Sequence, residues 1–190
     1  MNIKYLALSI FLSGSMNIAY ATPILSIDPT TQSVAQGSQV SFNIDISGLG
    51  SGLTLGTYDL SLSFNSTLLA YSSIQFGTGL NLFGLGDIQS VTPGAGNVEV
   101  FELSLDSAGA LNVFQQHQFT LATLTFDTLG KGTSPVSLSL KALGDAYGNS
   151  LTVAIQNSSI SVVPELPTFE LLIPGLIGIY FVGQRKRYYQ

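Results

Sequence analysis

Glu99 and Glu102 form the closest acidic pair in the sequence, and paired carboxyl groups are the chemistry of glycoside hydrolysis. A glycosidase needs two carboxyl groups that face each other at about 5 to 9.5 Å. On a strand, however, side chains three positions apart point to opposite faces. We therefore expect these glutamates to be solubilising residues at an edge or outer face of a sheet. They would form a catalytic pair only if a bulge interrupted the strand.

The single histidine, His117, lies in a polar segment between Gln115 and Gln118. A nucleophilic relay would require a serine in an elbow motif and a nearby aspartate, and neither accompanies this histidine. The sequence also has no cysteine, which excludes disulfide bonds, thiolate metal sites and cysteine nucleophiles. We therefore expect His117 to be an exposed loop residue and the protein not to be an enzyme.

Asp145 and Asn149 lie in a segment of turn residues where side-chain oxygens could help to bind a calcium ion. Calcium takes about six to eight oxygen ligands, so Asp106 or Asp87 from neighbouring loops would have to contribute. The spacing is not that of an EF-hand, and Asp and Asn are also common in ordinary turns. The sequence leaves both interpretations open, and we expect no other cofactor.

Charged residues make up only 9% of the 190 residues, whereas hydrophobic residues make up 45%; about 25% charged residues is usual in soluble domains. The formal net charge is -5, and no lysine or arginine occurs between residues 5 and 130. A surface that neutralises phosphate groups is not available there, so we expect no nucleic-acid partner. Serine, threonine and glycine are abundant instead, which favours strands and turns over long helices.

Residues 1–21 have the pattern of a secretory signal peptide. Lys4 supplies the positive start, an apolar core follows, and Ala19 and Ala21 form a cleavage site of small residues. We expect cleavage after Ala21 and export of the mature protein. A buried first helix is the alternative, and the strand pattern that begins after Pro23 disfavours it.

Residues 164–190 form a tail with three parts. These are the motif Pro164, Glu165, Leu166 and Pro167, an apolar run over residues 169–183, and the basic residues Arg185, Lys186 and Arg187. As a hydrophobic helix, the apolar run would span about 22 Å, which is shorter than the roughly 30 Å hydrocarbon core of a bilayer. A permanent anchor is therefore disfavoured, and we expect a transient stay in the inner membrane with the basic end in the cytoplasm. An amphipathic helix packed on the domain is the alternative.

The order of these three parts resembles the PEP-CTERM sorting signal of Gram-negative bacteria. Pro164 and Glu165 match the motif of that signal, and Leu166 stands where a second proline is usual. The resemblance implies that an exosortase-type enzyme cleaves the chain near this motif during export. It also implies that the mature protein ends on the outer surface or outside the cell.

The middle of the chain, residues 22–163, has the size of one domain. Apolar and polar residues alternate in it with the period of a β-strand. The strands that this alternation predicts lie at residues 40–46, 58–64, 122–126, 136–140, 151–155 and 160–162. Because turn residues separate them, we expect antiparallel connections and an all-β, two-sheet sandwich of about eight to ten strands. One short helical turn is expected within residues 107–116, with Asp106 or Ser107 as its N-cap.

The same segments resemble the cohesin-like modules of bacteria, which share a jelly-roll fold with family 2 and family 3 carbohydrate-binding modules. The resemblance rests on residues 25–29 and 34–40 with Gly37, the turn at 64–69, residues 119–126, the turn at 132–134 and the loop at 145–149. Asn65 and Ser66 replace the Asp and Pro that are usual in the first of these turns. The resemblance implies an antiparallel two-sheet jelly-roll sandwich over residues 24–163, which binds a ligand and performs no catalysis.

Two binding functions follow from this resemblance. Cohesins hold dockerin modules on one sheet face, which implies a protein partner, and the related modules hold polysaccharide. The sequence has no tryptophan, and Tyr58 lies in the alternation that fills the core, so binding to crystalline polysaccharide is disfavoured. We expect an exported, non-catalytic module at the cell surface or in the extracellular matrix that holds a protein partner on a sandwich face. The alternative is a component that binds a soft extracellular polysaccharide through Ser, Thr and Asn side chains.

Overall fold

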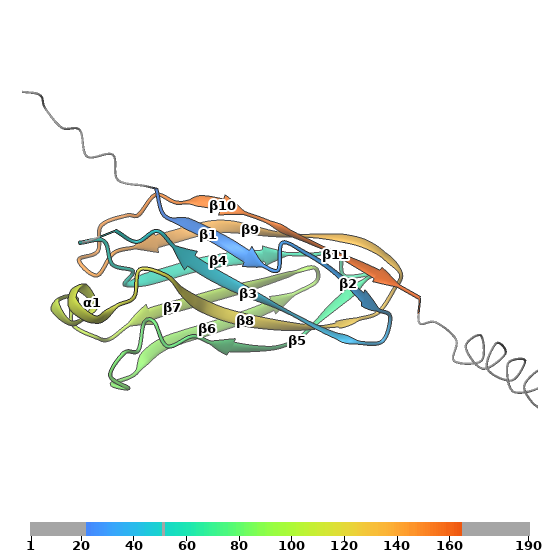
Figure 1. Cartoon of the computed structure of the whole chain (residues 1–190). Helices are drawn as coiled ribbons and strands as arrows, with labels where there is room; N and C mark the ends of the chain where they lie inside the picture. Colours follow the sequence, from blue (N-terminus) through green and yellow to red (C-terminus); the bar gives the residue numbers. More distant parts are fainter. Residues whose placement is uncertain (1–21, 51, 165–190) are drawn as a thin grey trace, which may run out of the picture.

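The computed structural model of the chain describes residues 22–50 and 52–164, which form a sandwich of two β-sheets (Figure 1). In chain order the elements are β1 (Ile24–Asp28), β2 (Thr31–Ala35), β3 (Gln39–Ser47), β4 (Thr57–Ser63), β5 (Leu69–Phe76), β6 (Asp87–Gly94), β7 (Asn97–Ser104), α1 (Ala108–Phe114), β8 (Phe119–Thr128), β9 (Gly132–Gly144), β10 (Ala154–Gln156) and β11 (Ser158–Val163). One sheet has five strands in the order β10-β1-β3-β8-β5, and the other has six in the order β2-β11-β9-β4-β7-β6. The predicted all-β, two-sheet sandwich is therefore confirmed.

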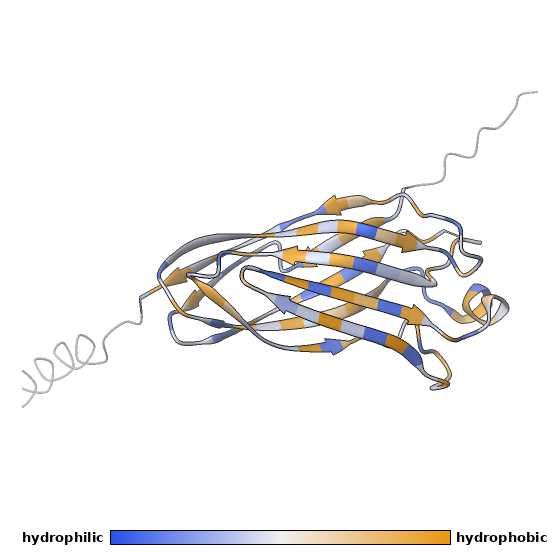
Figure 2. Ribbon diagram, turned by 180° about the vertical axis from the view of Figure 1, so that it is seen from behind, coloured by the Kyte–Doolittle hydropathy of each residue, from blue (hydrophilic) through white to orange (hydrophobic). Residues whose placement is uncertain are grey.

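The core lies between the two sheets and follows from the alternation of side chains along the strands. Figure 2 shows hydrophobic and hydrophilic residues alternating along the ribbon. Because successive side chains point to opposite faces, each sheet buries one apolar face against the other. Phe126 of β8 lies in this core, and its ring meets the ring of Phe64 edge to face with centroids 4.9 Å apart.

Two strand pairs are parallel, although the turn residues in the sequence favoured antiparallel connections. β1 is parallel to β10, and β2 is parallel to β11. The reason is that the chain crosses between the sheets near both ends of the domain, after β1 and after β10. The first and last strands of the domain therefore lie side by side in each sheet and run in the same direction.

β5 and β6 were not predicted, and β10 is shorter than the predicted strand at residues 151–155. β6 is an edge strand with mostly exposed side chains, so it lacks a buried face that would give apolar alternation. β5 has a register shift against β8 between Tyr71 and Ser73, which interrupts its period of two. The turn between β6 and β7 is short, because the two strands remain paired up to Gly94 and Asn97.

α1 is the predicted helical turn, and Ser107 is its N-cap. The Ser107 hydroxyl accepts a hydrogen bond from the Ala110 N–H at 3.2 Å. α1 lies at one end of the sandwich, whereas β11 ends at the opposite end (Figure 1). In the part of the chain that the structure describes, no helix has the length and hydrophobicity that a membrane crossing requires.

Candidate functional site

The outer face of the five-stranded sheet has a row of polar side chains that are hydrogen-bonded across β3 and β8. Four directly opposed pairs make up this polar ladder: Gln39 with Asp127 (2.9 Å), Ser41 with Thr125 (3.0 Å), Asn43 with Thr123 (2.7 Å) and Asp45 with Thr120 (2.6 Å). Side chains that are paired across strands lose rotamer freedom when the protein folds, and they do not lose it again on binding. The polar ladder is therefore a fixed surface of hydroxyl, amide and carboxylate groups.

A bulge keeps the last pair of the polar ladder on the outer face. The register between β3 and β8 shifts between Ile44 and Asp45. Leu121 and Ala122 are both buried as a result, although they are neighbours on one strand. Thr120 can then face outward, where its hydroxyl donates a hydrogen bond to the Asp45 carboxylate.

A groove of about 430 Å³ adjoins the end of the polar ladder that is nearer to α1. Its lining combines ladder residues with three aromatic rings and further polar groups: Asn43, Thr120 and Thr123; Phe76, Phe114 and Phe119; and Gln75, Gly77, Thr78, Gly79, Leu82 and Gln116. Two glycines allow the backbone to approach closely here. A Cβ atom on Gly77 would overlap the Thr120 carbonyl oxygen, and one on Gly79 would overlap the Phe119 ring. The groove therefore offers aromatic rings and uncharged polar groups together.

Glu102 is fully buried, so the expectation that it is a solubilising surface residue is wrong. Its carboxyl group accepts a 2.7 Å hydrogen bond from the Tyr58 hydroxyl, and Tyr58 is itself buried in the core as predicted. The side-chain alternation on β7 puts Val98, Val100 and Glu102 on the inner face. The sequence signal was present in this alternation, but the charge of the residue suggested the opposite face.

Burial and then the nearby Asp87 carboxyl group raise the pKa of Glu102 to about 8, whereas the hydrogen bond from Tyr58 acts in the opposite direction. Burial and the Glu102 carboxylate also raise the pKa of Tyr58. The Oε1 atom of Glu102 receives no hydrogen bond from any described residue. A buried carboxyl group in this setting favours its neutral form, which can donate a hydrogen bond to Asp87.

Glu99 points away from Glu102, as predicted, so the two glutamates do not face one cleft. Glu99 is partly exposed on the outer face of the six-stranded sheet, and its carboxylate lies 2.6 Å from the Lys141 ammonium. An exposed ion pair of this kind contributes little to stability, because solvent screens it. The geometry of a glycosidase pair is therefore absent at these two residues.

His117 is exposed, as predicted, and lies between α1 and β8. Its backbone carbonyl oxygen accepts a hydrogen bond from the Leu49 N–H at 3.2 Å.

Asp145 and Asn149 form a turn in the structure. The Asp145 carboxylate accepts hydrogen bonds from the Tyr147 and Asn149 N–H groups, both at 2.8 Å, and from the Asn149 side-chain amide at 2.9 Å. The Asn149 amide is the main cause that lowers the pKa of Asp145. Over residues 22–50 and 52–164, no three Asp, Glu or His side chains are grouped so as to hold a metal ion. Calcium binding by this turn stays a prediction.

Gln115 and Asp106 hold the end of the sandwich together, and no sequence pattern indicated the role of Gln115. The Gln115 amide accepts a hydrogen bond from the Leu55 N–H at 2.7 Å and donates to the Leu55 and Gly79 carbonyl oxygens at 2.8 and 3.0 Å. The Asp106 carboxylate accepts a hydrogen bond from the Leu82 N–H at 2.7 Å. These bonds join α1 and the segment before it to two loops that are distant in sequence.

The residues predicted for export and sorting lie mostly outside the described residues. They are Ala19 and Ala21 of the signal cleavage site, Glu165, Leu166 and Pro167 of the sorting motif, and Arg185, Lys186 and Arg187 of the basic tail. Pro164 is described; it is exposed and directly follows β11. Cleavage at either end of the chain stays a prediction.

Comparison with known proteins finds the same fold among solved cohesin modules. No family model matches the chain, and no curated protein matches it. A Clostridium thermocellum cohesin solved in a type I cohesin–dockerin complex is 14% identical, with a TM-score of 0.62, over 75% of this chain and 100% of that one. A non-cellulosomal cohesin from the archaeon Archaeoglobus fulgidus is 16% identical, with a TM-score of 0.59, over 75% of this chain and 92% of that one.

A third solved structure also has a similar fold at low sequence identity. The sixth cohesin from scaffoldin B of Acetivibrio cellulolyticus, solved in complex with a dockerin, is 21% identical, with a TM-score of 0.61, over 75% of this chain and 100% of that one. The described domain therefore has the cohesin fold, and the cohesin-like sandwich expected from the sequence is confirmed.

Proposed function

We propose that the protein is an exported, non-catalytic binding module that holds a protein partner on the outer face of the five-stranded sheet. The observation that supports this most directly is the polar ladder, because its eight side chains are already fixed by their four cross-strand hydrogen bonds. The fold adds support, since similar cohesins were solved in complexes with dockerins. The partner on this face is a protein with side chains that complement hydroxyl, amide and carboxylate groups.

Export and sorting belong to the same proposal. The signal peptide directs the chain out of the cytoplasm, the tail holds it briefly in the inner membrane, and an exosortase-type enzyme cleaves near Pro164 and Glu165. The mature module then resides at the outer surface or in the extracellular matrix. The exposed position of Pro164 after the last strand supports access by a processing enzyme.

A second candidate function is binding of an extracellular polysaccharide. The groove favours it, because three phenylalanine rings stand beside uncharged amide and hydroxyl groups, and sugar rings present both apolar faces and hydroxyl groups. An affinity gel that contains the polymer of the host bacterium tests this function. Retardation that disappears in Asn43→Ala would support it, and unretarded migration of the wild-type chain would exclude it.

The protein-binding function is tested with one variant on each sheet face. Ser41 lies in the polar ladder outside the groove, and Ser139 is an exposed serine on β9 of the other sheet. The full chain, Ser41→Arg and Ser139→Arg are each immobilised and exposed to an extract of the host bacterium, and the retained proteins are quantified. We expect the wild type and Ser139→Arg to retain the same protein and Ser41→Arg to lose it by about 10-fold or more. An empty wild-type column, or equal loss in both variants, would contradict the proposal.

A further inference from the structure

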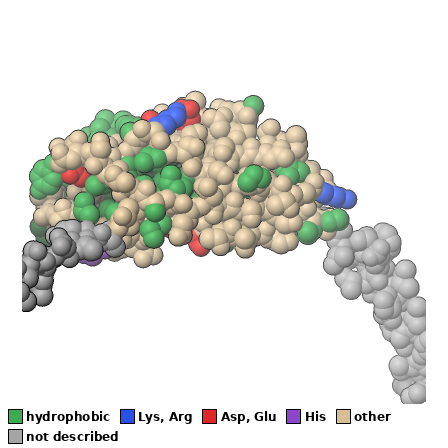
Figure 3. Space-filling model, turned by 90° about the horizontal axis from the view of Figure 1, so that it is seen from above, with side chains coloured by type: hydrophobic (Ala, Val, Ile, Leu, Met, Phe, Trp, Pro, Cys, Tyr) green, Lys and Arg blue, Asp and Glu red, His purple; other side chains and the backbone are tan. Residues whose placement is uncertain are grey.

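One end of the sandwich exposes a group of large apolar side chains, which we call the apolar cap. Its members are Phe83, Leu85, Leu105, Val113 and Phe114, and they are 53% to 72% exposed. Figure 3 shows hydrophobic side chains gathered toward this end, which is the end that has α1 in Figure 1. A group of large exposed apolar side chains at one end of a domain is typical of an interaction site.

The segments that form the apolar cap are tied to one another and to the core. The rings of Phe83 and Phe114 pack edge to face with centroids 5.4 Å apart. The segments next to these rings are hydrogen-bonded as well: the Ser104 hydroxyl donates a 2.6 Å hydrogen bond to the Leu80 carbonyl oxygen, and the Asp106 carboxylate accepts one from the Leu82 N–H. Exposure of an apolar side chain to water costs about 25 cal/mol per Å² of apolar surface. A partner that buried Phe83 and Phe114 would recover this free energy. The apolar cap is therefore a preformed surface.

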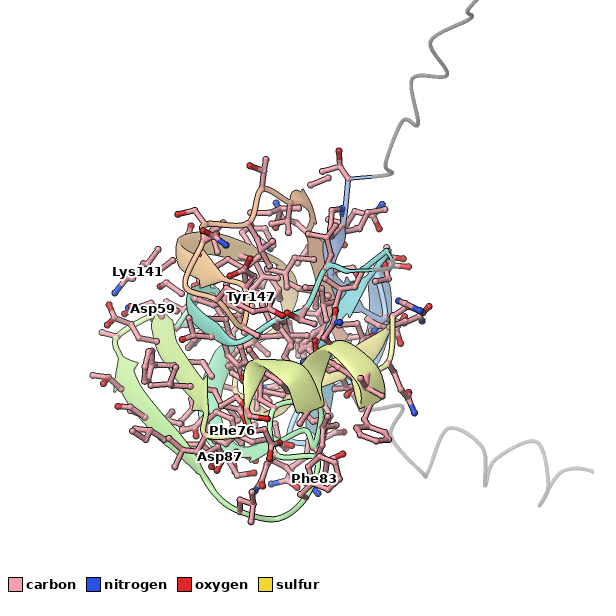
Figure 4. All side chains as sticks on the ribbon, turned by 90° about the vertical axis from the view of Figure 1, so that its left-hand side faces the viewer. Asp59, Phe76, Phe83, Asp87, Lys141 and Tyr147 are labelled. Carbon is pink, nitrogen blue, oxygen red and sulfur yellow. The ribbon has the colours of Figure 1, made fainter. Side chains whose placement is uncertain are left out.

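The apolar cap is continuous with the groove beside the polar ladder. Phe114 belongs to the apolar cap and also lines the groove. Leu82, which precedes the cap residue Phe83 in sequence, lines the groove as well. Figure 4 looks onto this end: Phe76, Phe83 and Asp87 lie on the same side of α1, and Tyr147 lies on the other side. An apolar side chain of a partner that rests on the cap can thus reach into the groove.

The charges near this end are all of one sign. Asp87 begins β6 next to the loop that contains Phe83 and Leu85, and Asp45 lies beside the groove through its hydrogen bond to Thr120. The described residues include two cations: Lys141 is paired with Glu99, and Lys131 lies beyond the end of β8 that is farther from α1. The surroundings therefore favour a partner with positive charges and disfavour an anionic membrane surface.

The apolar cap also faces away from the C-terminal attachment of the domain. β11 ends, and Pro164 follows, at the opposite end of the sandwich (Figure 1). If the domain is held at the Pro164 end, by its tail or by a surface, the apolar cap at the α1 end remains accessible to a partner. The position of the cap is therefore suited to a partner that approaches from outside.

We propose that the apolar cap docks a basic, amphipathic segment of a partner protein, whose apolar side chains cover Phe83, Leu85 and Phe114 and whose lysine or arginine side chains lie near Asp45 and Asp87. This inference rests on the proposed function only in that the partner is a protein. It adds a second surface, which adjoins the polar ladder at Asp45, and it states the chemistry of the segment that this surface binds.

The test uses three synthetic peptides of about four helical turns. One has Leu on one face and Lys on the other, one has Leu and Glu, and one has Ser and Lys. Each fluorescent peptide is titrated with the full chain, and its anisotropy gives the dissociation constant. We expect the Leu/Lys peptide to bind at least about 10-fold more tightly than either other peptide, and its binding to weaken as salt screens the charges.

Two variants at exposed apolar residues locate the binding. Phe114→Ser removes a ring of the apolar cap, whereas Leu129→Ser removes a half-exposed leucine that follows β8 at the opposite end. We expect the affinity for the Leu/Lys peptide to fall about 10-fold or more in Phe114→Ser and to stay unchanged in Leu129→Ser and in Ser41→Arg. Unchanged binding in Ser41→Arg separates this inference from the proposed function, because Ser41 lies in the part of the polar ladder that does not line the groove.

Three results would overturn the inference. Equal affinity for the Leu/Lys and Leu/Glu peptides would show that charge plays no part. A wild-type dimer in light scattering that becomes a monomer in Phe114→Ser would show that the cap pairs with a second copy. Sedimentation with phosphatidylcholine vesicles that is lost in Phe114→Ser would show that the cap meets lipid.

Discussion

The carboxyl group of Glu102 lies in the core with the Tyr58 hydroxyl as its hydrogen-bond donor, and the carboxyl group of Asp87 on β6 is close to it. Its pKa is raised from 4.5 to about 8, so the folded chain retains a proton that the unfolded chain releases above pH 4.5. Below pH 4.5 the folded and the unfolded chain both hold this proton, and the contribution of Glu102 to the free energy of unfolding is at its maximum. This contribution is lost as the pH rises toward 8, and above pH 8 it no longer changes.

This linkage predicts the pH dependence of stability. Between about pH 5 and 8, Glu102 should lower the free energy of unfolding by up to about 1.4 kcal/mol for each pH unit. Glu102→Gln keeps the shape of the neutral group and has no proton to lose. The free energy of unfolding of this variant should therefore decrease less steeply with pH than that of the wild type, by this amount. Urea denaturation at several pH values measures both profiles.

Glu99→Gln is the matched control, because Glu99 lies on the same strand but pairs with Lys141 at the surface. Its profile should retain the wild-type slope. Parallel profiles for the wild type and Glu102→Gln would contradict the placement of a protonated carboxyl group in the core.

At the scale of elements, the attachment of α1 depends on Gln115, which follows the helix. Its amide group makes three hydrogen bonds to the backbone of the loops at Leu55 and Gly79. In Gln115→Ala these partly buried backbone groups lose their partner, so we expect the free energy of unfolding to fall by about 1 to 3 kcal/mol. Hydrogen exchange at the Leu55 amide should become faster in the same variant.

The neighbouring Gln116→Ala is the control for this prediction. Gln116 is exposed and lines the groove, so its loss should change stability by less than about 0.5 kcal/mol. A similar small effect of Gln115→Ala would mean that its three hydrogen bonds do not hold the helix in place.

The elements that could be predicted from the sequence are those with one buried and one exposed face. β3, β4, β8, β9 and β11 were found in this way, whereas the helical turn at α1 was expected together with an N-cap at Asp106 or Ser107. β6 could not be predicted in this way, because both faces of this edge strand are mostly exposed and its apolar and polar residues do not alternate. The polar ladder could not be predicted either, since it depends on the register between β3 and β8, and residues far apart in sequence determine this register.

At the scale of the whole molecule, every strand of the described residues lies within residues 24–163. Cleavage after Ala21 and near Pro164 would therefore leave all of these described strands in place. We predict that the mature protein from its own host begins at Thr22 and ends near Pro164, and mass spectrometry of the secreted protein measures both termini. A mature chain that retains residues 1–21 or the basic tail would contradict the proposed route of export and sorting.

The most direct test of the central claim uses the absence of cysteine from the sequence. Ser41→Cys and Ser139→Cys each place a single thiol on one outer face of the sandwich. The rate of alkylation of each thiol is measured with and without the protein partner that the wild-type chain retains. Binding on the five-stranded sheet predicts that the partner slows alkylation at position 41 by about 10-fold or more and leaves position 139 unchanged. Protection at position 139 with an unchanged rate at position 41 would contradict the claim.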